Sequence, residues 1–459
     1  MRIALVCVLT ALGLGAQAFA WPPERISQNR PTAEQLAWQD LELGMFCHFG
    51  TNTFHDVEWG DGTASPDSFA PTQFDPKQWV AAASQSGIKY IIVTAKHHDG
   101  FCLWPTKQTD YCVRSSKWRD GKGDVIAQVA RACREAGVKF GVYLSPWDRH
   151  EPSYADSKTY DQFYMAQMTE LLTQYGEVTE FWSDGAGGKG HVYDWDAYYR
   201  HLKSLQPGCL QAIAGVAEIR WVGNEDGFAP DPMWNVVTRS GKPYWFPAEC
   251  DARIRRNWFW HSDDAGTLKS VDYLLKMYHG SVGHGANLLL NVGPDNRGLL
   301  PEQDVRRLKQ FWQAVQAIYA CNLLAPARAR ASSRQGGHPE RNAVDGNSDT
   351  YWLAAPDNPT AWIEVRLEDP MTFDRLVSQE AIQLGQRIRA YAIDIFDGTH
   401  WWRVCEGTSI GHKKIDVLPR PVTAQRVRLV VLEATGAPGL RGLHAFLAPE
   451  QYRAGPPEH

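Results

Sequence analysis

Short apolar runs alternate with helical patterns along the first 319 residues, and this alternation limits the possible folds more than any other feature of the chain. Several helical patterns begin at an Asp cap, as at Asp75 and Asp124, and end at a glycine. Strands that alternate with helices at this spacing indicate a parallel sheet. The strand-like runs cover residues 43–49, 89–95, 138–144, 179–183, 210–214 and 287–292, whereas residues 215–265 read mainly as loop.

A closed, TIM-like (β/α) barrel of the α/β class is the parallel fold that we expect. The alternative, a doubly wound open sheet, uses a glycine-rich phosphate loop after a strand, and the sequence contains none. In a barrel, the carboxyl ends of the strands meet at one mouth, where the chemistry takes place. Polar residues that stand at strand ends would gather there: His48, His97, His98, Tyr143, Asp184 and Asn291.

Asp184 is the strongest single candidate for chemistry. It follows a run of β-forming residues and precedes a glycine cluster at positions 185, 187 and 188. Glycines leave room for a ligand to approach the backbone closely. An aspartate in this place is a candidate nucleophile, base or metal ligand. The structural alternative is that Asp184 only opens an Asp-Gly turn.

Two later carboxylates are candidates for a second catalytic group. Glu225 lies in a loop with aromatic and glycine neighbours, and Glu249 follows the segment Phe-Pro-Ala. Glycoside cleavage needs one carboxylate that attacks and one carboxyl that protonates the leaving oxygen, about 5 Å apart when configuration is retained. An apolar ring such as Trp221 beside Glu225 suits a carboxyl that must keep its proton. The alternative for each glutamate is an exposed loop charge.

Composition and the N-terminus limit the partners and the destination of the chain. The net charge is −5 and there is no basic block, which argues against a nucleic-acid partner. Arg2, an apolar run over residues 3–14 and small residues up to Ala20 are typical of a signal peptide. We therefore expect cleavage after Ala20 and export to the periplasm or beyond. No later stretch is long and apolar enough to span a bilayer.

The pattern changes after about residue 325. Short alternating segments at 362–367, 392–396 and 426–431 predict an all-β antiparallel sandwich. We therefore predict a signal peptide over residues 1–20, a barrel domain over 21–325, a β-sandwich domain over 326–449 and a tail over 450–459.

Four segments together resemble the glycoside hydrolase family 29 α-L-fucosidases. They read LGMFCHFG at 43–50, AKHHDGF at 95–101, FWSDG at 181–185 and NLLLNVGP at 287–294. The resemblance covers roughly residues 30–320 and implies a retaining exo-hydrolase that acts on fucosylated oligosaccharides or glycoconjugates without a cofactor or a metal. Residues 220–227 resemble the subfamily that prefers α-1,3/1,4-linked fucose.

The resemblance also implies roles for individual residues. Asp184 corresponds to the nucleophile, and Glu225 to the acid/base with Glu249 in reserve. The segment at 256–260 departs from the family pattern around Trp258. The contacts to fucose that the resemblance implies are Phe46, His48, Glu58, Trp59, His97, His98, Tyr143, Trp182 and Trp258.

The C-terminal region resembles a discoidin-type (F5/8 type C-like) domain. Residues 343–347, 350–352 and 362–365 carry this match. Whether the domain binds sugar or calcium stays open at this point.

Two other functions also stay open for the whole chain. One is a non-catalytic fucose-binding lectin, and the other is a metal-dependent hydrolase that uses His97, His98 and Asp184.

Overall fold

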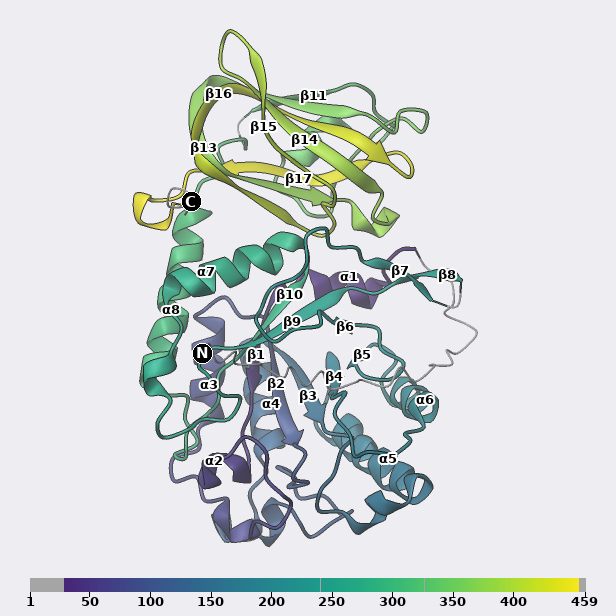
Figure 1. Cartoon of the computed structure of the whole chain (residues 1–459), viewed down its shortest axis with the longest axis vertical. Helices are drawn as coiled ribbons and strands as arrows, with labels where there is room; N and C mark the ends of the chain where they lie inside the picture. The colour runs from purple at the N-terminus through teal and green to yellow at the C-terminus, as the bar shows by residue number, and fades with distance from the viewer. Residues whose placement is uncertain (1–28, 240, 326, 454–459) are drawn as a thin grey trace, which may run out of the picture.

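The structure is a computed structural model that describes residues 29–239, 241–325 and 327–453. The predicted signal peptide, the predicted domain boundary at residue 326 and the end of the predicted tail lie outside the described residues. Two bodies follow one another along the long axis, an α/β body and an all-β body (Figure 1). The long helix α8 (Glu302–Ile318) leads from the first to the second.

Eight parallel strands form a nearly closed barrel in the order β5-β4-β3-β2-β1-β10-β9-β6. An isolated parallel bridge between Ala212 and Ile219 draws the two edge strands together, and the Ile213 N–H donates to the Ile219 carbonyl at 3.0 Å. The predicted barrel is therefore confirmed. Its strands are β1 (Leu43–Cys47), β2 (Tyr90–Lys96), β3 (Lys139–Leu144), β4 (Glu180–Ser183), β5 (Leu210–Ile213), β6 (Arg220–Trp221), β9 (Ala248–Arg253) and β10 (Asn287–Asn291).

The helices of the barrel domain follow the expected alternation. Asp75 accepts from the Lys77 N–H at 2.9 Å and Asp124 from the Ala127 N–H at 2.8 Å, so both predicted caps are confirmed. These two caps begin α3 and α4. Besides α8, the helices of this domain are α1 (Ala33–Gln39), α2 (Thr51–His55), α3 (Pro76–Ser84), α4 (Val125–Ala136), α5 (Ser157–Gln174), α6 (Trp195–Leu205) and α7 (Val271–Gly280).

The prediction of loop over 215–265 is wrong in part, because two barrel strands lie in this region. On β9 the residues Glu249, Asp251 and Arg253 alternate with small residues that are buried. Because these residues are charged, the strand lacks the apolar run from which a buried strand is predicted. The same region holds the hairpin of β7 (Val236–Arg239) and β8 (Lys242–Trp245), which forms a separate two-stranded sheet.

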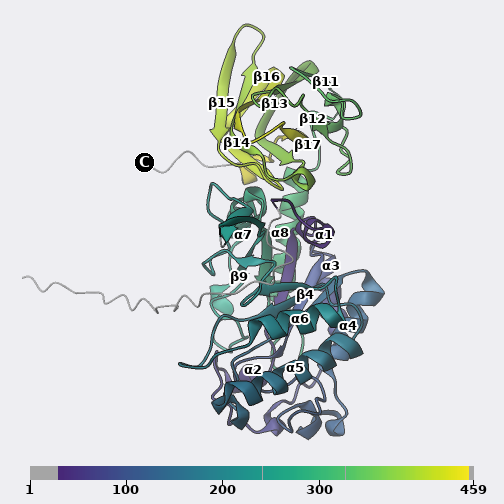
Figure 2. The same cartoon turned by 90° about the vertical axis from the view of Figure 1, so that its right-hand side faces the viewer.

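The C-terminal domain is built from antiparallel strands, as predicted. The long strands β13 and β16 pair along most of their length, with irregularities in register. Figure 2 shows this domain above the barrel, seen from the side. The strands are β11 (Arg328–Ala331), β12 (Trp352–Leu353), β13 (Trp362–Glu380), β14 (Ile388–Phe396), β15 (Trp401–Gly407), β16 (Lys414–Ala434) and β17 (Gly439–Phe446).

The C-terminal domain packs on the end of the barrel where the parallel strands begin. Lys413 Nζ lies 2.7 Å from a Glu42 carboxylate oxygen, immediately before β1. The Gln386 side chain accepts from the Asn235 N–H at 2.8 Å and donates to the Met233 carbonyl at 2.9 Å. This arrangement leaves the opposite end of the barrel, where the strands end, free of the second domain.

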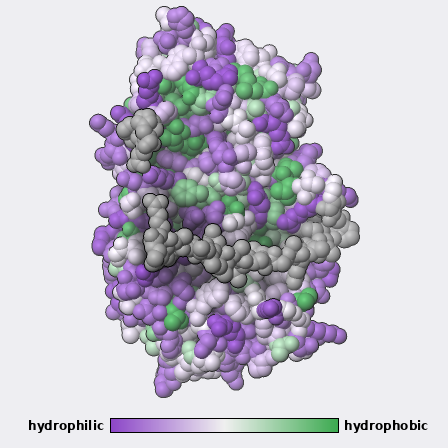
Figure 3. All heavy atoms as spheres, viewed as in Figure 1, coloured by the Kyte–Doolittle hydropathy of each residue, from purple (hydrophilic) through white to green (hydrophobic). Residues whose placement is uncertain are grey.

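The surface seen in Figure 3 is largely hydrophilic, with small separate hydrophobic patches. Within the described ranges, no helix has the length and apolar character needed to cross a membrane.

Candidate active site

Asp184 lies just after β4 and points into the barrel mouth. Its Oδ2 accepts from the Tyr143 hydroxyl at 3.0 Å, and its Oδ1 accepts from the Ala186 N–H at 2.7 Å. His98 Nε2 lies 3.8 Å from the same Oδ2, and the carboxylate side chain is 27% exposed. The carboxylate is thus fixed in direction by two donors but remains open on one side, as a nucleophile requires.

The histidines next to Asp184 are buried and are each oriented by a polar partner. His48 Nδ1 lies 2.8 Å from Asn291 Oδ1, and His98 Nδ1 lies 2.7 Å from Ser145 Oγ. Burial lowers the pKa of His48 to about 3 and lowers the pKa of His97 and of His98. These rings are therefore neutral near pH 7 and can exchange hydrogen bonds with sugar hydroxyls.

His97 and His98 use their ring nitrogens in different directions. His97 Nδ1 lies 3.5 Å from Asn52 Nδ2, whereas His98 turns toward Ser145 and Asp184. Across residues 29–239, 241–325 and 327–453, no group of three or more His, Cys, Asp or Glu side chains is arranged to hold a metal ion. This arrangement gives no support to the metal-dependent alternative.

Aromatic rings form one wall of the mouth. Phe46 lies 5.3 Å from Trp182 and 6.2 Å from Trp258, and Tyr143 stacks on Trp182 at 5.3 Å, all between ring centroids. Trp59 stands at the rim, 56% exposed, with its ring edge-on to His98 at 5.4 Å. Such rings can pack against the apolar face and the methyl group of a deoxy sugar.

Glu58 accepts three hydrogen bonds from one loop. Its carboxylate receives the backbone N–H groups of Trp258 and Phe259 at 2.9 and 3.1 Å, and His261 Nε2 lies 3.0 Å away. The Trp258 carbonyl in turn accepts from Asn291 at 2.7 Å. The structure thus shows Glu58 as the group that holds Trp258 at the mouth.

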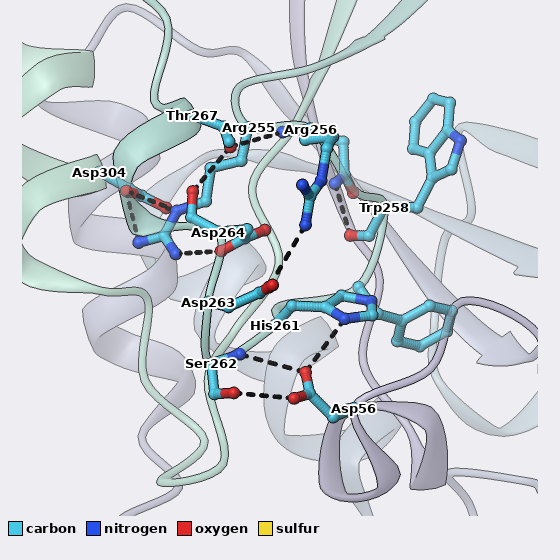
Figure 4. Close-up of polar contacts among 12 residues, drawn as sticks. Asp56, Arg255, Arg256, Trp258, His261, Ser262, Asp263, Asp264, Thr267 and Asp304 are labelled. Atoms are coloured by element: carbon cyan, nitrogen blue, oxygen red, sulfur yellow. Dashed lines mark hydrogen bonds and ion pairs between the residues drawn. The ribbon is translucent and has the colours of Figure 1, made fainter.

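Further contacts anchor the same loop at both ends (Figure 4). Asp56 accepts from Ser262 and faces His261, with Nδ1 3.0 Å from Oδ1. Arg255 lies between the buried carboxylates of Asp264 and Asp304, at 2.6 and 2.9 Å. Trp258 is therefore presented by a braced loop although its segment departs from the family pattern.

Replacing Glu58 by Ala is expected to lower kcat/KM for the substrate of this site by about tenfold or more, because each backbone hydrogen bond to a carboxylate contributes about 1.5–3 kcal/mol. The nearby exposed Asp61, whose carboxylate accepts from the Thr63 N–H and hydroxyl, provides the control Asp61→Asn with unchanged kinetics. Steady-state kinetics on both variants check this. Equal kcat/KM for Glu58→Ala and Asp61→Asn would contradict the role of Glu58.

Glu225 reaches the same mouth from the loop after β6. Its Oε2 lies 3.5 Å from Arg253 Nη2, and its side chain is 45% exposed. The Arg253 guanidinium lies 5.3 Å from the centre of the Trp258 ring. Contacts therefore run from Glu225 through Arg253 and Trp258 to the aromatic wall beside Asp184.

Glu249, the reserve candidate, lies inside the barrel below the mouth. It is fully buried, and it accepts from the Tyr90 hydroxyl at 2.6 Å and from Trp182 Nε1 at 3.0 Å. Burial raises its pKa and also the pKa of Glu180, which faces it. Both carboxylate oxygens of Glu249 are therefore engaged, one by Tyr90 and the other by Trp182, and Glu249 holds that indole in place.

Arg253 and Asn291 are two site residues whose contacts sequence reasoning did not predict. Asn291 was expected at a strand end, but its link to His48 needed the neighbouring strand. Arg253 lay in a region read as loop. The alternation of Glu249, Asp251 and Arg253 at every second position was the available signal.

A nearly closed barrel with an ordered carboxylate, neutral histidines and an aromatic wall at its mouth is the framework of a barrel glycoside hydrolase. Sequence comparison narrows this class. The profile described as Alpha-L-fucosidase matches residues 54–316, and the profile described as F5/8 type C domain matches residues 328–442. The chain belongs to the α-L-fucosidase family and carries an F5/8 type C domain.

Individual relatives agree over most of the chain. It is 40% identical over 444 residues to Alpha-L-fucosidase 1 of Arabidopsis thaliana, covering 91% of this chain and 87% of that protein. It is 26% identical to human tissue alpha-L-fucosidase over 377 residues, covering 69% of this chain and 77% of that protein. A Ruminococcus gnavus GH29 fucosidase, solved in complex with fucose, superposes with a TM-score of 0.86 at 30% identity, covering 96% and 99% of the two chains. The chain is thus an α-L-fucosidase, a glycoside hydrolase.

Proposed function

We propose that the enzyme removes terminal α-L-fucosyl groups by double displacement. In the first step an Asp184 oxygen attacks the anomeric carbon and forms an ester, while the bond to the leaving oxygen breaks and protonated Glu225 gives that oxygen its proton. In the second step water attacks the anomeric carbon, Glu225 takes the proton of this water, and the ester bond breaks. Fucose leaves with its original configuration.

The observation that carries this proposal is the environment of Asp184. Its carboxylate is oriented by the Tyr143 hydroxyl and the Ala186 N–H and stays open toward the mouth. Configuration of the first-formed product tests the mechanism. Proton NMR of early product is expected to show α-L-fucose before mutarotation, and β-L-fucose as first product would exclude double displacement.

We propose that the buried face of the mouth binds fucose. The neutral rings of His48, His97 and His98 and the Tyr143 hydroxyl suit the sugar hydroxyls, while Phe46, Trp182 and Trp258 suit its methyl group. Trp59 at the rim is placed to contact either fucose or the group next to it. The fucose complex of the Ruminococcus gnavus relative supports a fucose site in this family.

We propose a preference for α-1,3/1,4-linked fucose, since residues 220–227 resemble the subfamily with that preference. Initial rates on a Lewis-type trisaccharide are expected to exceed those on an α-1,2-fucosylated disaccharide by about tenfold or more. A binding pocket commonly discriminates between two related substrates by about 1–3 kcal/mol. Equal rates, or faster release from the α-1,2 substrate, would contradict the preference.

We also propose that the enzyme is exported after cleavage near Ala20, on the strength of its N-terminal sequence. N-terminal sequencing of protein recovered outside the cytoplasm is expected to begin at Trp21. Recovery of a chain that still begins at Met1 would contradict export by this route.

A further inference from the structure

The outer face of the C-terminal sheet carries a row of side chains whose charges alternate. Its members stand opposite one another across β11, β13, β16, β14 and β15. Glu364 lies 2.8 Å from one arginine and 2.6 Å from the next, and Asp394 lies 3.1 Å from a third. Each arginine of this alternating row is therefore paired with a carboxylate, although three arginines against two carboxylates leave the row one positive charge in excess. From edge to edge it consists of Arg330, Glu364, Arg428, Asp394 and Arg403.

The adjacent row on the same face has the opposite character. Arg328, Arg366 and Arg426 stand directly opposite one another on β11, β13 and β16. Neighbouring strands lie about 4.8 Å apart, and like charges placed directly opposite across a sheet are destabilising. We call these three residues the arginine row.

Among the described residues, the three side chains of the arginine row share one ion pair, between Arg426 and Glu364. Within the part of the chain that the structure describes, Arg328 and Arg366 make no ion pair or side-chain hydrogen bond. Arg426 comes only within 3.9 Å of Glu364, which already binds two other arginines. The whole chain carries a net charge of −5, so the charge of this row is opposite in sign to the net charge of the protein.

Aromatic rings continue the arginine row toward the sheet edge. Phe396 stands opposite Arg426, and Trp401 stands opposite Phe396. The Arg426 guanidinium lies 5.0 Å from the centre of the Phe396 ring, and the Phe396 and Trp401 rings lie 5.5 Å apart. The row thus has three cations at one end and two half-buried rings at the other, and the Arg428 guanidinium covers part of the Trp401 ring, 3.9 Å from its centre.

We infer that the arginine row and its two aromatic neighbours bind an acidic glycan, that is, a saccharide chain bearing sulfate or carboxylate groups. Guanidinium groups present paired donors that match such oxyanions. Aromatic faces pack against sugar rings. A glycan is the anionic partner that suits an enzyme whose substrates are glycans.

The site lies on the domain that packs at the amino ends of the barrel strands, so it is separate from the active-site mouth. A glycan held there leaves the mouth free. Binding at this site would keep the enzyme close to a polymeric substrate and raise the effective concentration of nearby fucosyl groups. It requires no change in the chemistry at Asp184.

Binding of the full chain to dextran sulfate, with uncharged dextran as a second probe, tests this inference. The wild type is expected to bind dextran sulfate and not dextran in affinity electrophoresis. The double variant Arg328→Gln/Arg366→Gln is expected to weaken binding of dextran sulfate by about tenfold or more, since the loss of each charge-assisted hydrogen bond lowers the affinity by about that factor. The single variant Arg403→Gln is the control, because Arg403 lies on the same face but is paired with Asp394.

Two further readouts, activity and Tm, separate a binding role of the arginine row from a structural one. The double variant is expected to keep full activity on an aryl fucoside and an equal or higher Tm, because it relieves repulsion within the row. Equal binding by the double variant and the wild type, or an equal loss in Arg403→Gln, would overturn the inference. Tighter binding of a single-stranded oligonucleotide of equal charge would show that the partner class is wrong.

Discussion

Replacement of Asp184 by Asn is expected to lower kcat for an aryl fucoside by about 10⁴-fold or more, as removal of a catalytic nucleophile does in other hydrolases. The amide is nearly the same size as the carboxylate, and its oxygen can still accept from the Ala186 N–H. Ground-state binding of fucose should therefore survive, while ester formation becomes impossible. Stopped assays with high enzyme concentration measure the residual kcat.

Two controls belong with this variant. Its Tm should stay within a few degrees of the wild-type Tm, since the Asp184 side chain is partly exposed and the exchange of Asp for Asn conserves volume. Fucose titration should give a dissociation constant close to that of the wild type. A folded Asp184→Asn enzyme that retains about one tenth of the wild-type kcat would be incompatible with nucleophilic catalysis by Asp184.

The second large effect is expected at Glu225, and it should depend on the leaving group. Replacement by Gln is expected to lower kcat/KM for an oligosaccharide by about 10²–10⁴-fold, the usual contribution of a general acid. An aryl fucoside whose leaving group is a strongly acidic phenol needs little protonation. Its kcat/KM, which reports the first step, should therefore fall far less. The ratio of the two kcat/KM values is the measurement.

The neighbouring Asp226 and the buried Glu249 supply the comparisons for this variant. Asp226→Asn should leave kcat/KM unchanged for both substrates, because the Asp226 side chain is exposed; this variant controls for the loss of one negative charge in the loop of Glu225. Glu249→Gln should affect both substrates alike, since Glu249 acts through the position of Trp182. A leaving-group dependence in Glu249→Gln and none in Glu225→Gln would transfer the acid role to Glu249.

The sequence predicted the barrel because most of its strands are apolar and are separated by capped helices. The strand of residues 90–96 is buried along its whole length and could be recognised by composition alone. The strand of residues 248–253 could not, because Glu249, Asp251 and Arg253 face the interior of the barrel and are stabilised there by partners far away in the sequence. Local patterns do not contain those partners.

The site was predictable to the extent that strand order alone defines it. Asp184, His98 and Tyr143 end neighbouring parallel strands and therefore had to meet at one mouth. The part played by Glu58 was not predictable in the same way. Its three hydrogen bonds join it to a loop 200 residues further along the chain, and only the tertiary structure shows that it positions Trp258.

The central claim is that Asp184 forms a covalent ester with fucose. Incubation with 2-deoxy-2-fluoro-fucosyl fluoride tests it most directly, since the fluorine at C2 slows turnover and fluoride leaves without help from an acid. Peptide mass spectrometry is expected to find the fluorofucosyl group on Asp184. An inactivated enzyme that carries this group on another carboxylate, or full turnover of the reagent by Asp184→Asn, would contradict the account.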